Sequence, residues 1–415
     1  MIFVANVLAM NGGTTFLIRT CRELAKRGQR SAVLVLRRHF EPALLAELEV
    51  HATVFWLDDF LLDKGKLFRS YFGIFGFAAW RRLNSALCGF GEQVHAMGVF
   101  SLLFAFRLAG RRKNSRVTVG IYHQNEFVFA APPFYFARES QRLFTRLPTG
   151  NVVFFNEGTR NSYGDYFCLD YSGSTTVPIG VDLSRIEDAK KSSDTNRIVS
   201  IGNLEAFKTY NAHMIGVVAK LVGKYPGLRY EIYGTGDEEQ VLRALIDRLN
   251  VGQHVQLFGA LPYADLVRTI ETATLFVGSG TALVEAAALG VPAIIGIESI
   301  PTPETYGLLS DVDGLSYNED NLPMPKVPMH DLVDRLLTDG AYRASMGRAC
   351  KEKSRMFSVT ATVDGLLGLD QTANANAPRL GYWQLIRLAV SLAAMALADR
   401  FGVSSTFAER RNQSF

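Results

Sequence analysis

Hydrophobic and polar positions follow one another along most of the chain in a pattern that predicts alternating strands and helices. Short runs rich in β-branched residues are followed by stretches in which apolar residues recur at helical spacing. This alternation is typical of βαβ units that build a mostly parallel sheet. We therefore expect an α/β protein with doubly wound sheets, each covered by helices on both faces.

The alternation is clearest in the second half of the chain. Strands are predicted there at 197–201, 229–233, 254–258, 274–277 and 292–295, and helices at 211–224, 237–250, 263–272 and 282–289. The first half repeats the pattern less cleanly, with strands predicted at 2–8, 31–36, 53–56, 116–122 and 151–155. An aromatic and basic segment, residues 60–115, separates the third and fourth of these strands, and we interpret it as a helical insertion.

The length of 415 residues suggests two or three domains. A polar, turn-rich segment around residues 190–196 marks one boundary, and the small-residue tract 371–378 is typical of a flexible tether. We expect three parts: an N-terminal Rossmann-like lobe at 1–190 carrying the basic aromatic insertion, a C-terminal Rossmann-like lobe at 191–370, and a linker with an amphipathic tail at 371–415. Within the tail, 382–401 is predicted to be a helix.

Composition excludes several classes of protein. Hydrophobic residues make up 48% and charged residues 20%, which argues against a disordered or collagen-like chain. No uncharged apolar run reaches the roughly 20 residues needed to cross a bilayer. The four cysteines lie far apart with no CxxC spacing, so neither a disulfide framework nor a zinc site is indicated. A reducing cytoplasm is the expected compartment.

Positive charge gathers in one part of the chain although the net charge is only +4. Residues 60–116 hold ten Lys and Arg against two acidic residues, a balance of +8. Within this stretch, residues 66–82 mix aromatics with cations as interfacial helices do. Both this segment and the tail 382–401 are expected either to contact anionic lipid or to pack on protein. A nucleic-acid partner is disfavoured, because the cations lie in an apolar segment rather than on a nucleic-acid motif.

One candidate site lies at residues 275–286, where a strand, a glycine turn and a helix start follow one another. Glycines let the backbone approach a ligand, and the free amides and dipole of the first helical turn favour an anion such as phosphate. Glu285 comes one turn into that helix, where its carboxylate can bind the two hydroxyls of a ribose. The alternative is a plain strand-to-helix turn with Glu285 facing solvent.

A second strand-to-helix turn, residues 201–211, carries a lysine, Lys208. At the carboxyl end of a strand in an open sheet such a lysine points toward the ligand crevice, where it can neutralise a departing pyrophosphate. The alternative is a solvated surface lysine. A third turn, Gly234-Thr235-Gly236, lacks the third glycine of a dinucleotide fingerprint, so hydride chemistry is not supported.

In the first half, Gly12 and Gly13 lie between the first strand and first helix, where their amides can close over a ligand or form a structural turn. His123 follows a strand end and can hydrogen-bond a transferred sugar or an acceptor, although most histidines at loop starts do no chemistry.

Together these motifs resemble the retaining family-4, or group 1, glycosyltransferases of GT-B architecture. The resemblance covers roughly residues 1–365 and is strongest at 177–296. It depends on five elements in order: Gly12-Gly13, Val177-Pro178-Ile179-Gly180-Val181-Asp182, Gly202 with Lys208, Gly234-Thr235-Gly236, and Leu283-Val284-Glu285-Ala286.

The resemblance implies two Rossmann-like lobes with a cleft between them and transfer of a sugar from a nucleotide-sugar co-substrate with retention, without a metal or another cofactor. Lys208 then matches the lysine that holds the donor diphosphate, and Glu285 matches the glutamate that binds the ribose; with His123 they form the expected catalytic set. The donor-binding residues expected besides Lys208 and Glu285 are Gly12, Gly13, Gly202, Asn203, Gly234, Gly236, Phe258, Ala260, Leu261, Gly278, Ser279, Gly280, Thr281, Ala282 and Leu283.

The chain departs from the family pattern at two positions. Asn203 stands where the family has an arginine, and Val277 stands where the family has the first of two glutamates eight positions apart. One positive contact to the diphosphate and one carboxylate contact to the sugar are therefore in doubt.

The expected function is a glycosyltransferase of bacterial cell-surface polysaccharide or glycolipid assembly, with a lipid-linked or glycan acceptor. It is expected in the cytoplasm, with contact to the inner face of the cytoplasmic membrane if the lipid interpretation holds. Two alternatives stay open: a degenerate module that binds nucleotide sugars without turnover, and a nucleotide-sugar epimerase, which needs acids and bases positioned for proton transfer at the sugar.

Overall fold

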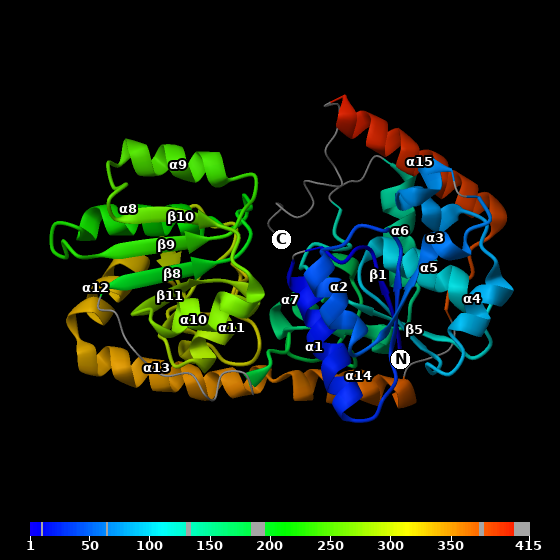
Figure 1. Ribbon diagram of the computed structural model, residues 1–415, viewed down its shortest axis with the longest axis horizontal. Helices are drawn as coiled ribbons and strands as arrows, with labels where there is room; N and C mark the ends of the chain where they lie inside the picture. Colours follow the sequence, from blue (N-terminus) through cyan, green and yellow to red (C-terminus); the bar gives the residue numbers. More distant parts are fainter. Residues whose placement is uncertain (10, 64, 130–133, 184–195, 373–376, 402–415) are drawn as a thin grey trace. The chain divides into compact units, whose positions relative to one another are not determined.

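The computed structural model describes the chain except for residues 10, 64, 130–133, 184–195, 373–376 and 402–415 (Figure 1). Contacts within the chain divide it into two compact units. The N-terminal unit consists of Met1–Val177 together with the described residues between Thr360 and Phe401, and the C-terminal unit is Pro178–Val359. Each unit is built on its own parallel sheet, and each is described by itself.

The N-terminal unit contains a seven-stranded sheet in the order β3-β2-β1-β4-β5-β6-β7. Its strands are β1 Ile2–Ala5, β2 Ala32–Val35, β3 Thr53–Trp56, β4 Gln93–Ala96, β5 Arg116–Gly120, β6 Val152–Phe154 and β7 Thr175–Thr176. All neighbouring strands pair in parallel. The order reverses between β1 and β4, and in open α/β sheets ligands bind outside the carboxyl ends of the strands at such a point.

Helices connect these strands. They are α1 Gly12–Lys26, α2 Pro42–Glu49, α3 Leu57–Phe60, α4 Trp80–Ala86, α5 Val99–Ala109, α6 Tyr135–Thr145, α7 Glu157–Phe167, α14 Val359–Thr372 and α15 Tyr382–Arg400, with short 3-10 turns η1 Lys66–Arg69, η2 Tyr71–Phe75 and η3 Thr149–Asn151. Apolar side chains from both the sheet and α5 fill the core, and nearly every residue of α5 is buried.

The interpretation of residues 60–115 as an insertion is wrong. This segment contains β4, which lies between β1 and β5 inside the sheet, and the buried helix α5. The sequence of β4 is Gln-Val-His-Ala, and its two polar residues interrupt the apolar pattern by which a buried strand is recognised. All four residues are nevertheless buried. His95 contacts Thr118 Oγ1 at 3.0 Å and Tyr122 Oη at 2.8 Å. The hydrogen-bonding capacity of the ring is thus satisfied inside the protein.

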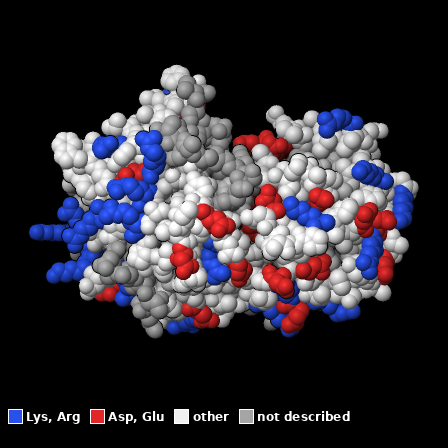
Figure 2. Space-filling view, turned by 180° about the vertical axis from the view of Figure 1, so that it is seen from behind, with Lys and Arg blue, Asp and Glu red and all other residues white. Residues whose placement is uncertain are grey.

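Residues 66–82, which were compared with interfacial helices, do not form one helix. The chain makes the two turns η1 and η2 instead, and α4 begins only at Trp80. Two glycines interrupt the segment, and a Cβ at Gly73 would lie 2.4 Å from the carbonyl oxygen of Phe68. Arg107 of α5 donates to the carbonyls of Ile74 and Gly76, which fixes the turns on the core. Figure 2 shows the Lys and Arg side chains gathered on this side of the N-terminal unit.

The C-terminal unit contains a five-stranded parallel sheet in the order β10-β9-β8-β11-β12. Its strands are β8 Arg197–Ile201, β9 Arg229–Tyr233, β10 Val255–Gly259, β11 Leu275–Gly278 and β12 Ala293–Ile295; its helices are α8 Tyr210–Leu221, α9 Glu239–Arg248, α10 Leu266–Glu271, α11 Gly280–Ala288, α12 Met329–Thr338 and α13 Gly340–Ser354. A small antiparallel pair, β13 Glu304–Thr305 and β14 Val327–Pro328, and the turns η5 Tyr263–Asp265, η6 Leu309–Asp311 and η7 Arg355–Phe357 complete it. Its order reverses between β8 and β11.

The division between the units differs from the boundaries expected at 190 and 370. Residues after Val177 already belong to the C-terminal unit, since Val181 N donates to Phe357 O at 2.8 Å and Val359 N donates to Val181 O at 3.1 Å. The described residues between Thr360 and Phe401 pack on the N-terminal unit, where Gln93 Nε2 donates to Leu366 O at 3.2 Å. The polar segment 190–196 lies almost wholly outside the described residues.

The tail forms the predicted helix, α15, and packs within the N-terminal unit. Leu388, Leu392 and Met395 are buried against that unit's core. Ser391 Oγ accepts from Phe136 N at 2.9 Å, and Gln384 Nε2 donates to Glu139 Oε1 at 2.6 Å. One face of the tail therefore packs on protein. In the part of the chain that the structure describes, no helix is both long and apolar enough to cross a membrane.

Candidate active site

Three loops meet at the carboxyl ends of β8, β11 and β12 in the C-terminal unit. They are residues 202–209 after β8, residues 278–280 between β11 and α11, and residues 296–300 after β12. Backbone hydrogen bonds of 2.7 Å join them, from Gly296 N to Gly278 O and from Ser299 N to Phe207 O. Two motifs that lie about 70 residues apart in the sequence are thus brought to one place, at the switch point where a doubly wound sheet binds its ligand.

Lys208 extends its ammonium across the backbone of Gly202. A Cβ at position 202 would lie 2.8 Å from Lys208 Nζ, and Gly202 has a φ of 153°, so both space and backbone conformation call for glycine there. Lys208 is half-buried, and its charge acts on the buried carboxylate of Glu298. The lysine is therefore not a fully solvated surface residue.

Gly234 and Gly236 permit close packing of two loops. A Cβ at Gly234 would lie 1.9 Å from Gly202 O, and a Cβ at Gly236 would lie 2.2 Å from Leu204 O. Leu204 N also donates a hydrogen bond to Thr235 O at 3.0 Å, which joins the two loops. The structure thus gives these two glycines a packing role that holds the Lys208 loop in position, whether or not they also touch a ligand.

The glycine turn before α11 leaves the first amides of the helix uncapped by its own N-cap residue. Ser279 is the N-cap but does not bond to the helix amides; its Oγ donates to Glu298 Oε1 at 2.8 Å instead. Gly280 has a φ of 64° and opens the helix. Gly280, Thr281 and Ala282 are half-buried, whereas the side chain of Leu283 belongs to the core. Amides at a helix N-terminus and a nearby ammonium suit a diphosphate.

Glu285 does not face solvent, because only 4% of it is exposed. Its charge lies near the hydroxyl of Tyr317, whose pKa is raised by burial and by the charges of Glu319, Glu298 and Glu285. Tyr317 Oη donates to Gly280 O at 3.1 Å, so this group sits directly beside the start of α11. Glu285 therefore belongs to a cluster of buried carboxylates at the site.

Two members of this cluster, Glu298 and Glu319, were missed by the sequence analysis. Burial raises the pKa of Glu298, while the charge of Lys208 and hydrogen bonds from Ser279 and Asn318 lower it. Burial also raises the pKa of Glu319 to about 7. The available signal was an acidic residue three positions after a strand, in Gly296-Ile297-Glu298, but such a signal is common in loops.

The structure shows where the two departures from the family pattern lie. Val277 is fully buried in the hydrophobic core, so a carboxylate is not accommodated at this position. Glu298 instead brings a carboxylate to Ser279, two residues further along the chain. Asn203 is exposed at the loop surface.

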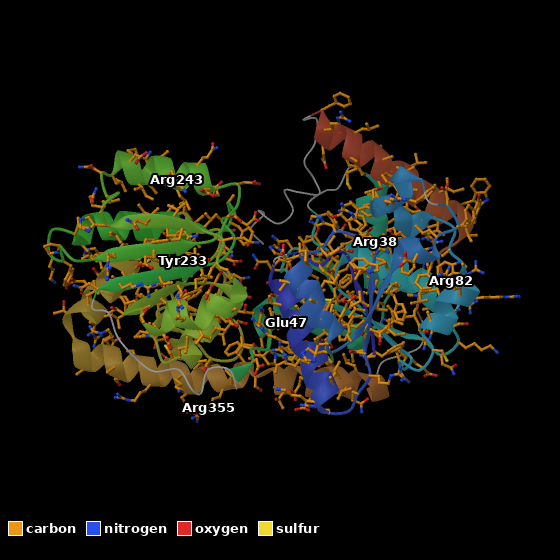
Figure 3. The ribbon with its side chains drawn as sticks, viewed as in Figure 1. Arg38, Glu47, Arg82, Tyr233, Arg243 and Arg355 are labelled. Carbon is orange, nitrogen blue, oxygen red and sulfur yellow. The ribbon has the colours of Figure 1, made fainter. Side chains whose placement is uncertain are left out.

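The loop expected to read the base carries an exposed aromatic ring. Phe258 is 49% exposed and stacks on Tyr233, with ring centroids 4.9 Å apart and an interplanar angle of 15° (Figure 3 labels Tyr233). Gly259 O accepts from Gly234 N at 2.7 Å, which links this loop to the glycines described above. Ala260 is exposed and Leu261 half-buried.

The remaining predicted residues lie in the N-terminal unit. Asn11 caps α1 by accepting from Thr14 N at 3.0 Å, and Gly12 and Gly13 are the first residues of that helix, at the carboxyl end of β1. His123 is half-buried, and its Nδ1 accepts from Asn125 N at 3.2 Å. The same loop holds Glu126, whose Oε1 accepts from Val99 N at 3.0 Å at the start of α5. Both groups lie near the ends of strands around the β1–β4 switch point.

Comparison with known proteins shows what the C-terminal unit is similar to. Residues 184–308 match the family model described as glycosyl transferases group 1. A relative from Corynebacterium glutamicum, described as a GDP-mannose-dependent monoacylated alpha-(1-6)-phosphatidylinositol monomannoside mannosyltransferase, is 28% identical over 204 residues, which cover 42% of this chain and 49% of the relative. The chain thus spans about half the length of the curated relatives it matches.

Solved structures match over most of the chain. The Anabaena protein HepE, determined with UDP and glucose, has a TM-score of 0.62 at 14% identity and covers 89% of this chain and 99% of its own. A variant of TarM from S. aureus, determined with fondaparinux, alpha-GlcNAc-glycerol and UDP, has a TM-score of 0.65 at 13% identity over 89% of this chain and 99% of its own. Residues 184–308 of the C-terminal unit are therefore similar to the group 1 glycosyl transferases, and the chain has the two-lobed, Rossmann-like α/β GT-B fold.

Proposed function

We propose that the protein is a retaining glycosyltransferase, which moves a sugar from a nucleotide-diphosphate donor to a hydroxyl acceptor. The observation that carries this proposal is the half-buried ammonium of Lys208 beside the uncapped start of α11, with buried carboxylates next to both. A cation and helix amides complement a diphosphate, and carboxylates accept hydrogen bonds from sugar hydroxyls. The Corynebacterium relative is described as using GDP-mannose, which supports a donor of this class.

In the proposed reaction, Lys208 and the amides of Gly280 to Leu283 stabilise the negative charge that builds up on the departing diphosphate. The acceptor hydroxyl attacks the anomeric carbon on the face that the leaving group occupies and passes its proton to that group. Glu285 binds the ribose, and Glu298 takes the place of the carboxylate absent at Val277. Because Lys208 and the amides stabilise the negative charge of the diphosphate, we propose that neither a metal nor a further cofactor is required.

Residues of the N-terminal unit complete the proposal. We assign His123 to orienting the transferred sugar or the acceptor, and the amides of Gly12 and Gly13 to closing over the donor. The remaining residues assigned to donor contacts are Gly202, Asn203, Gly234, Gly236, Phe258, Ala260, Leu261 and Gly278 to Ala282. The half-buried position of His123 beside a strand end supports the first assignment.

We further propose an acceptor that is a lipid-linked sugar or a glycan, in cell-surface polysaccharide or glycolipid assembly at the inner face of the cytoplasmic membrane. The description of the Corynebacterium relative, which names a phosphatidylinositol monomannoside, supports this class of acceptor.

The alternative of a degenerate module without turnover is less favoured because of Glu298. Its carboxylate next to Ser279 takes the place of the carboxylate that is absent at Val277.

The proposal is tested by measuring binding and diphosphate release with a panel of GDP- and UDP-sugars, using wild type, Lys208→Ala and the control Lys220→Ala. Lys220 is an exposed lysine of α8, so its loss changes charge without touching the site. We expect one donor to bind and release nucleotide diphosphate, with both activities impaired only in Lys208→Ala. Binding without release, with lipid and glycan acceptors present, would favour the degenerate module, and product formed from donor alone would favour an epimerase. No binding by folded protein contradicts the proposal.

A further inference from the structure

Helix α15 has two apolar faces on opposite sides, and only one of them is covered by protein. Leu388, Leu392 and Met395 form the buried face against the N-terminal unit. On the other side the exposed apolar residues Trp383, Val390 and Leu397 are 75%, 65% and 55% exposed, and Phe401, just after the helix, is 75% exposed. A helix that only packs on its own unit has no need of this second face.

The exposed residues lie in one row along the helix. Trp383, Val390 and Leu397 are spaced by seven residues, which is close to two helical turns, so their side chains lie in a row along the helix. The helix is 19 residues long, which corresponds to about 28 Å. Arg387 lies at the edge of the row, and its guanidinium is 4.5 Å from the ring centroid of Tyr135. The stripe begins with the exposed aromatic pair Tyr382 and Trp383, and such amphipathic rings are suited to the interface between a membrane and water.

A second exposed apolar group belongs to the same unit. The turns η1 and η2 lead from α3 to α4, and η2 contacts α15. The exposed apolar residues in and around these turns are Leu62, Leu67 and Phe77, at 71%, 57% and 66% exposure. Arg69, Arg81 and Arg82 are exposed close to them in the sequence, and Figure 3 labels Arg82 at the outer edge of the unit.

Charge decides which partner fits this surface. Residues 60–82, which contain the two turns, carry five Lys and Arg against one aspartate, a balance of +4, and residues 377–401 carry three arginines against one aspartate, a balance of +2. Figure 2 shows the cations gathered on this unit. A second copy of the chain would bring like charges together, whereas anionic lipid headgroups attract the cations and accept the aromatic and aliphatic side chains.

We propose that the exposed stripe of α15, with the neighbouring turns, is a docking surface for an anionic lipid bilayer. Trp383, Val390 and Leu397 enter the headgroup region, and the arginines beside them contact lipid phosphates. This deepens the proposed function by naming the surface that brings the enzyme to a lipid-linked acceptor, and it rests on that function for the acceptor alone. Binding to lipid needs neither donor nor turnover.

The test is co-sedimentation of the full chain with phosphatidylcholine vesicles that contain or lack phosphatidylglycerol. The variant carries Trp383→Ser, Val390→Ser and Leu397→Ser together. The matched control carries Val241→Ser and Leu249→Ser, because these are exposed apolar residues at 56% and 37% exposure, at α9 of the other unit. We expect wild type and control to bind the anionic vesicles, and the triple variant to bind at least about ten-fold more weakly.

Two further readouts sharpen the result. Wild-type tryptophan emission should shift to the blue on adding anionic vesicles, since Trp383 is 75% exposed and leaves water, and the shift should be absent from the single variant Trp383→Ser. Higher salt should weaken the binding of wild type to anionic vesicles.

Equal vesicle binding by wild type and triple variant overturns the proposal, as does absence of binding by wild type. Self-association of wild type that the triple variant loses would replace it with a dimer interface. Release of nucleotide diphosphate can be measured separately with a water-soluble acceptor. That measurement does not depend on vesicle binding, so the two proposals fail separately.

Discussion

Glu298 is the residue whose proposed role depends most on the tertiary structure. It is buried, it accepts from Ser279 Oγ at 2.8 Å, and the charge of Lys208 acts on it. We expect Glu298→Gln to lower kcat by about 10–100-fold, because the amide accepts fewer hydrogen bonds and carries no charge toward the sugar and Lys208. Folding should be preserved, since a neutral amide is less costly to bury than a carboxylate. The control is Glu304→Gln on β13, and steady-state kinetics with thermal unfolding provide the measurement. An unchanged kcat contradicts the role.

Gly236 is expected to be essential for stability. A Cβ there would meet the carbonyl oxygen of Leu204 at 2.2 Å, and a backbone carbonyl cannot turn aside as a flexible side chain can. We expect Gly236→Ala to lower the free energy of unfolding by about 1–3 kcal/mol. Gly216→Ala in α8 is the matched control, because nothing lies within 4 Å of the added Cβ, and it should stabilise by roughly 0.5–1 kcal/mol. Similar effects of both substitutions in denaturant titrations would show that the close approach does not matter.

His95 makes the N-terminal unit sensitive to acid. Burial lowers its pKa to about 3, whereas an unfolded histidine has a pKa of about 6.5. Between these pH values the unfolded chain binds a proton that the folded chain does not, so stability falls as pH falls, by up to about 1.4 kcal/mol per pH unit from this residue. We expect a shallower loss in His95→Gln and an unchanged loss in His330→Gln, whose side chain is partly exposed on α12. Unfolding free energies measured from pH 7 to pH 4 decide this.

At the scale of elements, α15 is an integral part of the N-terminal unit. Leu388 is fully buried, and the helix bonds to α6 through Ser391 and Gln384. We expect Leu388→Ala to destabilise the unit by about 2–5 kcal/mol, because it leaves a cavity in the core. Leu397→Ala, on the exposed face, should change stability by less than about 0.5 kcal/mol. Comparable losses in thermal unfolding would mean that the two faces of α15 are not distinct.

Elements differ in how well the sequence predicts them. The strands β3, β8 and β9 have the predicted bounds, because each is a short run, mostly buried or half-buried, with clear turns on both sides. The strand β4 was missed, since Gln93 and His95 interrupt the apolar pattern and their burial depends on partners such as Leu366 and Tyr122. The segment 66–82 was expected to be helical because it mixes aromatics with cations, but Arg107 of another element binds the carbonyls of Ile74 and Gly76 in its turns.

At the scale of the whole molecule, the assigned residues lie in two units, and hydrogen exchange can show whether one ligand reaches both. We expect a nucleoside diphosphate to protect the amides of residues 202–209 and 280–283, because a ligand that binds only the folded state slows local opening. The intact nucleotide sugar should additionally protect residues 11–15 and 121–126, where Gly12, Gly13 and His123 are assigned to it. Protection confined to the C-terminal unit with every donor would contradict those three assignments.

The sequence by itself determined the doubly wound α/β class, the order of the motifs and the identity of Lys208 and Glu285 as site candidates. These follow from local rules, since strand periodicity, glycine turns and helix starts depend on neighbouring residues. Only the tertiary structure decided that Glu298 joins the site, that Gly234 and Gly236 are packing residues, that residues 93–96 form a central strand, and that α15 has a covered and an uncovered face. Each of these depends on contacts between residues far apart in the chain, and no local pattern of hydrophobic and polar positions contains them.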